Sequence, residues 1–395
     1  MLIFSRKLNR YASFVALLPL FFLMSALVQL SAYADGGAPN LAYIAGTTGG
    51  VSVLDVGQGK VTKTLSLAGD PHMILLSQDG RVLYVTQPVL GRVSAIVAGT
   101  GQTLCSVALP GHPSTLALSQ DGNVLYVGGE GAKGVAAIDT ATCHVRQTYT
   151  TGGSVYGVWL VNGGALSSQS GQLWATGSNS ISIFALQGAL LKTIPVTGGP
   201  QYLCIPPTGT TAYVTTRRGS IDIIDLKTWN VRQVLSGGDY GTMDYDALTL
   251  EVYVPDTLHH SINVLTPPAG NTLAVEPVRV YHTVDAPTSV AITNDGLFGF
   301  FALQGGKVEV FDLIDRDPVY TITVGGNPHF VITGLYPPAQ AVPQPTTITA
   351  APLPTTGSGT PFNPFLIVVP ILLILLGGVS LVGMLWLFHR PSKRQ

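Results

Sequence analysis

The sequence predicts an all-β chain that closes into a seven-bladed β-propeller, flanked by two apolar terminal segments. A strand centred on an aromatic residue recurs seven times, at intervals of 39 to 48 residues. An alternating strand follows each copy, and the first copy lacks an innermost strand that the end of the repeat region supplies. Repeats of about 40 residues with four short strands each are typical of propeller blades.

The aromatic strands have a large ring near their centre. They are residues 41–45, 83–86, 125–128, 173–176, 212–215, 252–255 and 299–302. The strands that follow alternate apolar and polar side chains, as half-buried strands do. They are residues 51–55, 93–96, 135–139, 181–184, 221–225, 262–265 and 308–312. A third strand of the type 63–67 and a fourth that follows a Gly-x-Pro signal complete each unit, and hairpin turns such as Asp79-Gly80 end the fourth.

The two ends of the repeat region predict how the ring closes. The region begins at Leu41 with the second strand of a blade, and residues 328–333 form an innermost strand with no blade after it. We expect the late strand to complete the first blade, because closure removes the free sheet edges that favour aggregation. A row of separate sandwich domains is the alternative, against which the even spacing and the split blade argue.

Two of the aromatic strands read Tyr84-Val85-Thr86-Gln87 and Tyr213-Val214-Thr215-Thr216. With these segments, residues 40–335 resemble the YVTN family of β-propeller repeats, and the match weakens after the third unit. The resemblance implies a secreted or surface-layer propeller, and it implies no single activity. The fourth unit is stretched near residues 163–171, and the sixth has residues 237–246 where the Gly-x-Pro signal and an apolar strand are expected.

The N-terminal segment, residues 1–34, is typical of a secretory signal peptide. Three basic residues precede an apolar run at residues 14–30, and small residues at 32 and 34 allow cleavage between Ala34 and Asp35. The alternative is an uncleaved membrane anchor. Cleavage would leave the propeller, residues 35–336, as the first part of the mature chain.

The C-terminal segment predicts a single membrane span. Residues 365–388 are apolar and uncharged, and as a helix they would extend about 36 Å, enough for a bilayer core of about 30 Å. The basic tail at residues 389–395 is expected to stay cytoplasmic by the positive-inside rule. The propeller would then lie on the extracellular side of the cell surface.

Residues 337–364 form a linker rich in Pro and Thr, which predicts an extended stalk. It contains Leu353-Pro354-Thr355-Thr356-Gly357, which resembles the LPXTG sorting signal of cell-wall-anchored surface proteins. The resemblance implies that a sortase attacks the Thr356 carbonyl, releases Gly357 and the residues after it, and joins the chain to cell-wall peptide. The alternative is a chance pentapeptide in a stalk whose apolar helix remains as the anchor.

Charge and motifs exclude several classes of function. Residues 35–336 carry 14 Lys and Arg against 21 Asp and Glu, a net charge of −7. Binding to nucleic acid depends on clustered Lys and Arg, so we expect no nucleic-acid partner. The sequence has no haem attachment motif, P-loop or paired-cysteine zinc motif, and we therefore predict no cofactor.

The position after each Gly-x-Pro signal predicts a polar ring at one mouth of the central channel. In blade order this mouth ring is His329, His72, Ser114, Tyr156, Gln201, Gly241 and Thr288. It could contact a ligand, and two imidazoles in adjacent blades could grip a metal. A third metal ligand is not visible, and we predict no metal. The alternative is a funnel of solvated side chains.

Two rows further along the innermost strands are expected to pack between blades. The first is Ile74, Leu116, Val158, Leu203, Met243, Val290 and Val331. The next is Leu75, Ala117, Trp159, Cys204, Asp244, Ala291 and Ile332, and Asp244 interrupts it. A carboxylate in such a row needs a partner or open space. With Asp239 and Asp246 nearby, it is either a catalytic or ligand-binding acid or a structural acid bonded to neighbouring backbone. The aspartates that recur at strand ends, such as Asp55, indicate turn hydrogen bonds.

The chain has three cysteines, and outside the cytoplasm a disulfide is permitted. Cys105 and Cys143 lie in neighbouring blades but out of register, so the sequence leaves their pairing open. Cys204 is expected to be buried and inert. We predict no catalytic residue, because no local motif places a nucleophile beside a histidine and an acid.

These observations favour a non-enzymatic surface propeller that binds a protein, glycan or small ligand, or that forms part of an envelope layer. The alternative is an extracellular enzyme of the hydrolase or lactonase kind, with its site at the channel mouth. The feature that separates the two is whether His72, His329 and Asp244 converge.

Overall fold

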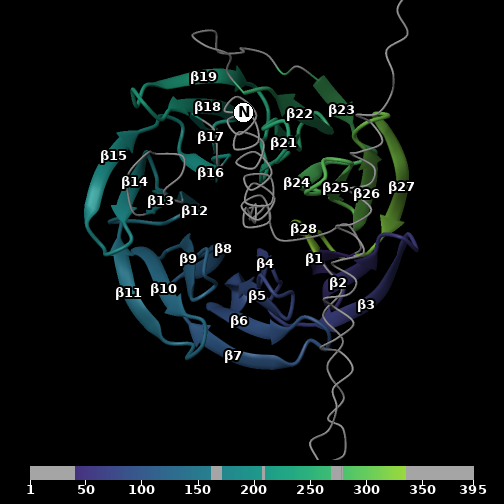
Figure 1. Cartoon of the computed structure of the whole chain (residues 1–395), viewed down its shortest axis with the longest axis horizontal. Helices are drawn as coiled ribbons and strands as arrows, with labels where there is room; N and C mark the ends of the chain where they lie inside the picture. Colours follow the sequence, from purple (N-terminus) through teal and green to yellow (C-terminus); the bar gives the residue numbers. More distant parts are fainter. Residues whose placement is uncertain (1–40, 162–170, 207–209, 268–276, 278, 335–395) are drawn as a thin grey trace, which may run out of the picture. The chain divides into compact units, whose positions relative to one another are not determined.

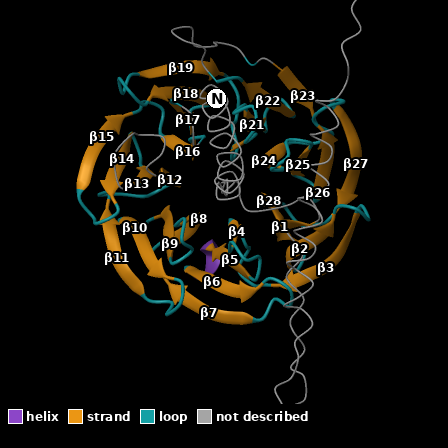
Figure 2. Cartoon of the chain, in the orientation of Figure 1, coloured by secondary structure: helices purple, strands orange, loops and turns teal. Residues whose placement is uncertain are grey.

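The seven predicted blades are present as seven four-stranded antiparallel sheets arranged around a central axis (Figures 1 and 2). A computed structural model describes residues 41–161, 171–206, 210–267, 277 and 279–334. The predicted signal peptide, stalk, sorting signal, apolar segment 365–388 and basic tail lie outside the described residues. The fold class is therefore confirmed for the propeller.

Each blade is given from the centre outward. The first blade is β28 (Phe330–Gly334), β1 (Leu41–Thr47), β2 (Gly50–Asp55) and β3 (Lys60–Ser66). The second is β4 (Ile74–Leu76), β5 (Val82–Gln87), β6 (Arg92–Val97) and β7 (Thr103–Ala108), with a 3-10 turn, η1 (Pro88–Leu90), between β5 and β6. The third is β8 (His112–Leu118), β9 (Val124–Glu130), β10 (Gly134–Asp139) and β11 (Val145–Thr150). The fourth is β12 (Gly157–Val161), β13 (Gln172–Thr176), β14 (Ser180–Ala185) and β15 (Leu190–Pro195).

The remaining blades follow the same order. The fifth is β16 (Pro200–Cys204), β17 (Thr211–Thr216), β18 (Ser220–Asp225) and β19 (Val231–Ser236). The sixth is β20 (Asp244–Tyr245), β21 (Val252–Asp256), β22 (Ser261–Leu265) and β23 (Arg279–His282). The seventh is β24 (Pro287–Ile292), β25 (Phe298–Leu303), β26 (Lys307–Asp312) and β27 (Asp317–Thr323).

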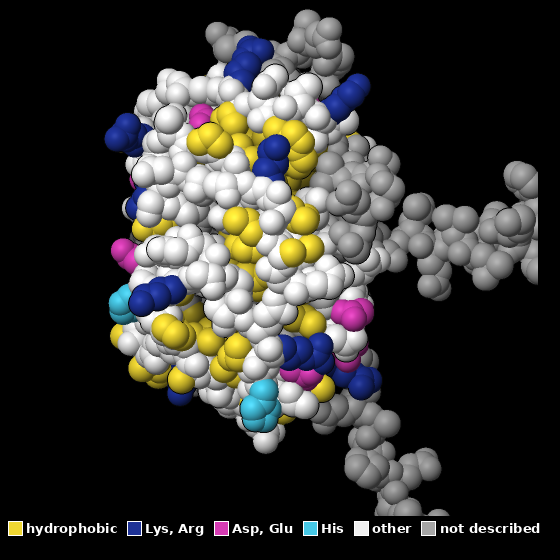
Figure 3. Space-filling view, turned by 90° about the vertical axis from the view of Figure 1, so that its left-hand side faces the viewer, with side chains coloured by type: hydrophobic (Ala, Val, Ile, Leu, Met, Phe, Trp, Pro, Cys, Tyr) yellow, Lys and Arg dark blue, Asp and Glu magenta, His cyan; other side chains and the backbone are white. Residues whose placement is uncertain are grey.

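Burial along the strands follows from the way blades pack face to face. Every residue of β1, β2 and β17 is buried, because a middle strand has a neighbouring blade on both of its faces. The outermost strands β3 and β15 bury only one residue each. Leu190 and Leu191 of β15 are 56% and 48% exposed, and Figure 3 shows apolar side chains between charged ones on this side of the rim.

The first blade is completed by the last strand, as predicted. In β1, Leu41 pairs with Gly334 and Tyr43 pairs with Ile332 of β28. One face of β1 packs in a buried cluster with Ile74 and Leu83 of the second blade, and its other face packs in a cluster with Phe300 of the seventh. The closing sheet therefore shares a core with both neighbours.

The sixth blade departs from the repeat where its sequence does. Its innermost strand β20 has only two residues, and isolated bridges join Tyr240 to Asp256 and Thr242 to Ser289. At Gly241 an added Cβ would lie 2.2 Å from the carbonyl oxygen of Thr288. The close approach of the two backbones therefore requires glycine at this place.

The three cysteines form one disulfide and one free thiol. A disulfide joins Cys105 in β7 to Cys143 in the turn after β10, so it links the second and third blades. Cys204 is a free, buried thiol. Within the part of the chain that the structure describes, no helix is both long enough and apolar enough to span a bilayer.

Candidate functional site

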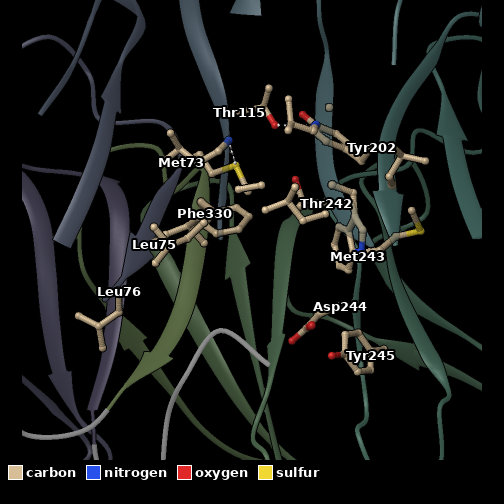
Figure 4. Close-up of a pocket in the computed structure, with 18 of the residues that line it drawn as sticks. Met73, Leu75, Leu76, Thr115, Tyr202, Thr242, Met243, Asp244, Tyr245 and Phe330 are labelled. Atoms are coloured by element: carbon tan, nitrogen blue, oxygen red, sulfur yellow. Dashed lines mark hydrogen bonds between the residues drawn. The ribbon is translucent and has the colours of Figure 1, made fainter. Parts of the chain in front are cut away.

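The innermost strands of all seven blades surround a cavity of about 540 Å³, which we call the axial cavity (Figure 4). Its wall is mainly apolar and aromatic. The side chains that matter for the argument are Met73, Leu75, Trp159, Tyr202, Met243 and Phe330. Polar groups line it as well, including Thr115, Thr242 and one carboxylate, Asp244. A cavity of this size, with apolar walls and few polar groups, is typical of small-ligand sites.

The wall comes largely from positions that the sequence analysis did not single out. It includes the residues directly after the mouth ring, which are Met73, Thr115, Gly157, Tyr202, Thr242 and Phe330. A strand turns successive side chains to opposite sides, so the residue after a ring position points differently from the ring residue itself. The repeat itself could have identified these residues, because the position directly after each mouth-ring residue forms one more row of equivalent positions.

The two rows expected to pack between blades behave differently. The row that begins with Ile74 is buried throughout, as predicted. In the row that begins with Leu75, the side chains of Cys204, Ala291 and Ile332 are buried, whereas Leu75, Ala117 and Trp159 are half-buried and line the axial cavity. Leu75, Ala117 and Trp159 also pack against buried clusters, so the predicted packing is present and these residues line the cavity in addition.

Asp244 lies half-buried on β20 and opens onto the axial cavity. Its Oδ2 accepts a hydrogen bond of 2.7 Å from the backbone N–H of Ile292 on β24, in the next blade. Burial raises the pKa of Asp244 to about 7, and the neighbouring Asp246 adds to the rise, while the backbone donors oppose it. The structure thus gives this acid both a backbone partner and open space.

The other two candidate acids do not join it. Asp246 accepts a hydrogen bond from the backbone N–H of Leu248 at 2.8 Å and one from the Thr249 hydroxyl at 2.7 Å, which makes it a turn-forming residue. The backbone N–H of Asp239 donates to Asp256, and neither Asp239 nor Asp246 lines the axial cavity. Asp244 is therefore the one carboxylate among the residues described in the cavity wall.

At the mouth ring the structure brings His72 and His329 together. Their rings stack with centroids 5.0 Å apart. His72 Nδ1 lies 3.2 Å from the carbonyl oxygen of Ser114, and His329 Nε2 lies 3.2 Å from both carboxylate oxygens of Asp70. Burial, together with the adjacent His329, lowers the pKa of His72 to about 4, so its imidazole is neutral at pH 7.

The other mouth-ring residues bond within their own surroundings. The Thr288 hydroxyl donates to the carbonyl oxygen of Pro328 at 2.8 Å. The Tyr156 ring lies 4.2 Å from the guanidinium carbon of Arg217. The backbone carbonyl of Gln201 accepts a hydrogen bond of 2.7 Å from Thr176. These contacts engage Thr288, Tyr156 and Gln201 with neighbours other than the histidine pair.

The histidine pair and Asp244 do not line the same described wall. Asp244 belongs to the wall of the axial cavity, whereas His72 and His329 are not among its described residues. Among the described residues, no group of three or more His, Cys, Asp or Glu side chains is placed to hold a metal ion. His72, His329 and Asp244 therefore do not form such a group.

Comparisons with known proteins identify the fold. No family model matches the chain, and no curated protein does. Among solved structures, it is similar to a functionally unknown protein from Desulfotomaculum acetoxidans, with a TM-score of 0.61 and 14% identity over 75% of this chain and all (100%) of that one.

Two enzymes or enzyme components are also similar in structure. Hydrazine synthase from Kuenenia stuttgartiensis has a TM-score of 0.53 and 18% identity over 71% of this chain and 93% of that one. Dihydro-heme d1 dehydrogenase NirN has a TM-score of 0.55 and 16% identity over 78% of this chain and 77% of that one. At such identities the likeness concerns the backbone arrangement only. The chain is thus a seven-bladed member of the β-propeller fold.

Proposed function

We propose that the chain is a non-enzymatic binding protein of the cell surface, whose propeller holds a small, largely apolar ligand in the axial cavity. The observation that carries the proposal is the cavity itself, about 540 Å³ in volume and walled by residues such as Trp159, Tyr202 and Phe330. Binding sites for small molecules commonly have 300–1,000 Å³ of space and apolar walls with few polar groups. Burial of apolar ligand surface would supply most of the affinity.

Two observations support placement outside the cytoplasm. The Cys105–Cys143 disulfide is a type of bond that persists in oxidising compartments and is rare in the cytosol. The N-terminal residues 1–34 and the C-terminal residues 365–395 have the pattern of a signal peptide and of a membrane anchor with a basic tail. We therefore propose export, with anchoring by the C-terminal span or by covalent attachment to the cell wall.

The hydrolase or lactonase alternative has less support. It needs several metal-binding or acid groups gathered at the channel mouth. Asp244 lines the axial cavity, whereas His72 and His329 are not among its described wall residues. The carboxylate that His329 contacts is Asp70, which is not among the described residues of the cavity wall. The histidine pair therefore contacts Asp70 rather than Asp244, the carboxylate of that wall. We accordingly propose binding rather than catalysis.

Binding can be tested with the full-length protein in zwitterionic lipid nanodiscs, by equilibrium dialysis against tryptophol, a neutral indole alcohol. Empty nanodiscs correct for partition of the probe into lipid. We expect saturable binding by the wild-type protein and its loss in Ala117→Trp, whose new ring would fill the axial cavity. Val89→Trp adds the same ring at a position that is 70% exposed and should bind as the wild type does. Equal binding by all three proteins would contradict the proposal.

Anchoring has a separate test, which is mass spectrometry of the protein extracted from its native surface. A mature N-terminus at Asp35 and a C-terminal Thr356 joined to cell-wall peptide would support export and sortase processing. An intact C-terminus at Gln395 would reject processing and leave the apolar segment as the anchor.

A further inference from the structure

We propose that the axial cavity selects an organic cation, a primary ammonium group on an apolar body, and that Asp244 binds the ammonium. This inference rests on the proposed function, because it names the class of ligand for the same cavity. It is carried by the surroundings of one carboxylate, by the absence of a counter-charge among the described wall residues, and by aromatic side chains that line the same cavity.

The hydrogen bond at Asp244 favours its ionised form. The backbone N–H of Ile292 donates to Oδ2 at 2.7 Å, a distance typical of a bond to a charged acceptor. A neutral carboxyl protonated on Oδ1 also accepts this bond at Oδ2, but the bond to a charged oxygen is stronger, so the backbone donor favours ionisation. The blade interface thus supplies a donor to this carboxyl group.

That carboxylate has no positive partner in the cavity. The described residues of the wall include no Lys, Arg or His. Around Asp244 itself, the ionisable groups include Tyr245 on the same strand, Cys204 on β16, Tyr253 opposite it on β21, and Asp246 in the turn that follows β20. The strand β24, which provides Ile292, has no ionisable side chain. None of these groups is a cation.

An unpaired carboxylate beside apolar walls carries a desolvation cost, which an incoming cation would offset. Burial is also the main cause that raises the pKa of Asp244. An ammonium group fits this need better than a proton alone, since it brings hydrogen-bond donors while its apolar body occupies the remaining volume. Trp159, Tyr202 and Phe330 line the same cavity, and their faces attract cations.

An inorganic cation suits the site less well. Ca²⁺ and Mg²⁺ take about six or more oxygen ligands, and Mg²⁺ keeps several waters. The described wall offers one carboxylate, and no metal-binding cluster is found in the described parts of the chain. Walls such as Met73, Leu75 and Phe330 offer no ligand to an inorganic ion. Apolar walls around one acid therefore point to an organic cation.

The test compares three ligands that share an indole ring and differ in charge: tryptamine, tryptophol and indole-3-acetate. Each is titrated into full-length protein in zwitterionic nanodiscs at pH 8, with empty nanodiscs as the reference. We expect tryptamine to bind about 10-fold or more tightly than tryptophol, because a hydrogen bond between charged groups in a partly desolvated site exceeds a neutral one. We expect indole-3-acetate to bind more weakly than either.

The matched variant is Asp244→Asn, which keeps the size of the side chain and an oxygen that can accept from Ile292. It should reduce tryptamine binding to the level of tryptophol while leaving tryptophol binding within about 2-fold of the wild type. At pH 5 the wild-type preference for tryptamine should shrink, since Asp244 becomes protonated. Asp239→Asn, which changes an acid outside the cavity wall, should preserve the preference.

Three results would overturn the inference: tryptophol binding as tightly as tryptamine at pH 8, an unchanged preference in Asp244→Asn, or a preference that grows at pH 5. In each of these, tryptophol binding that Ala117→Trp abolishes would still support the axial cavity as a ligand site. Absence of binding by all three ligands would overturn the inference and the proposed function together.

Discussion

Tyr43 of β1 lies directly opposite Ile332 of β28, so the first and last described strands of the propeller belong to one sheet. Both side chains are fully buried in the cluster between the first and second blades. The ring is therefore closed by backbone pairing and by packing at the same place.

Removing the Ile332 side chain should weaken that closure. We expect Ile332→Ala to lower the free energy of unfolding by about 2–5 kcal/mol, because it leaves a cavity in a buried cluster. Ile314→Ala, at a position that is 67% exposed, should change it by less than about 0.5 kcal/mol. Equilibrium unfolding in urea measures both, and equal effects would argue against closure through β28.

The closing pair could be predicted because it depends only on the repeat. Once each aromatic strand is recognised as the second of a blade, residues 328–333 have a vacant place beside Tyr43. The disulfide could not be predicted in the same way. Cys143 lies in a turn with a positive φ of 56°, and this local turn brings it to Cys105 across the blade interface. Repeat spacing says nothing about such a turn.

The disulfide should contribute measurable stability. We expect replacement of both Cys105 and Cys143 by Ser to lower the free energy of unfolding by about 2–4 kcal/mol, since the bond restricts the unfolded chain over 38 residues. Either single Ser variant should lose nearly as much as the pair, because each one breaks the same bond. Thiol titration of unfolded wild-type protein should find one free thiol before reduction and three after it. Three thiols without reductant would refute the bond.

The candidate site shows where sequence patterns stop being informative. The break at Asp244 was visible in its row, but its partner is the backbone of Ile292 in another blade, a contact that no local pattern encodes. The mouth ring stays a prediction. The wall of the cavity includes the row one residue further on, at Met73 and its equivalents, because successive side chains of a strand point to opposite sides.

His72 should make the protein sensitive to acid. The pKa of His72 is about 4 in the folded protein and about 6.5 when exposed, so the unfolded chain takes up its proton first as the pH falls. Stability from the neutral imidazole is present above pH 6.5 and is lost towards pH 4, by up to about 3 kcal/mol. His72→Gln should flatten the fall in unfolding free energy over this range. The exposed His144→Gln serves as control, and a slope unchanged by His72→Gln would count against this explanation.

Titration of Asp244 should change the free energy of unfolding in the direction opposite to that of His72 as the pH falls. Its pKa is raised to about 7 from 3.8, so the folded, ligand-free protein takes up this proton first as the pH falls, and stability rises from pH 8 towards pH 4. We expect Asp244→Asn to be more stable than the wild type at pH 8 by about 1–3 kcal/mol, and the difference to vanish near pH 4. Thermal unfolding across this pH range measures it. A variant that is less stable at pH 8 would show that the charge is already compensated in the empty cavity.

The most direct measurement of the central claim is an experimental structure of the full-length protein with tryptamine bound. The account predicts ligand density inside the axial cavity, with the ammonium nitrogen within hydrogen-bonding distance of an Asp244 carboxylate oxygen and the indole ring against Trp159, Tyr202 or Phe330. Density at the outer rim only, or an empty cavity at saturating ligand, would contradict it.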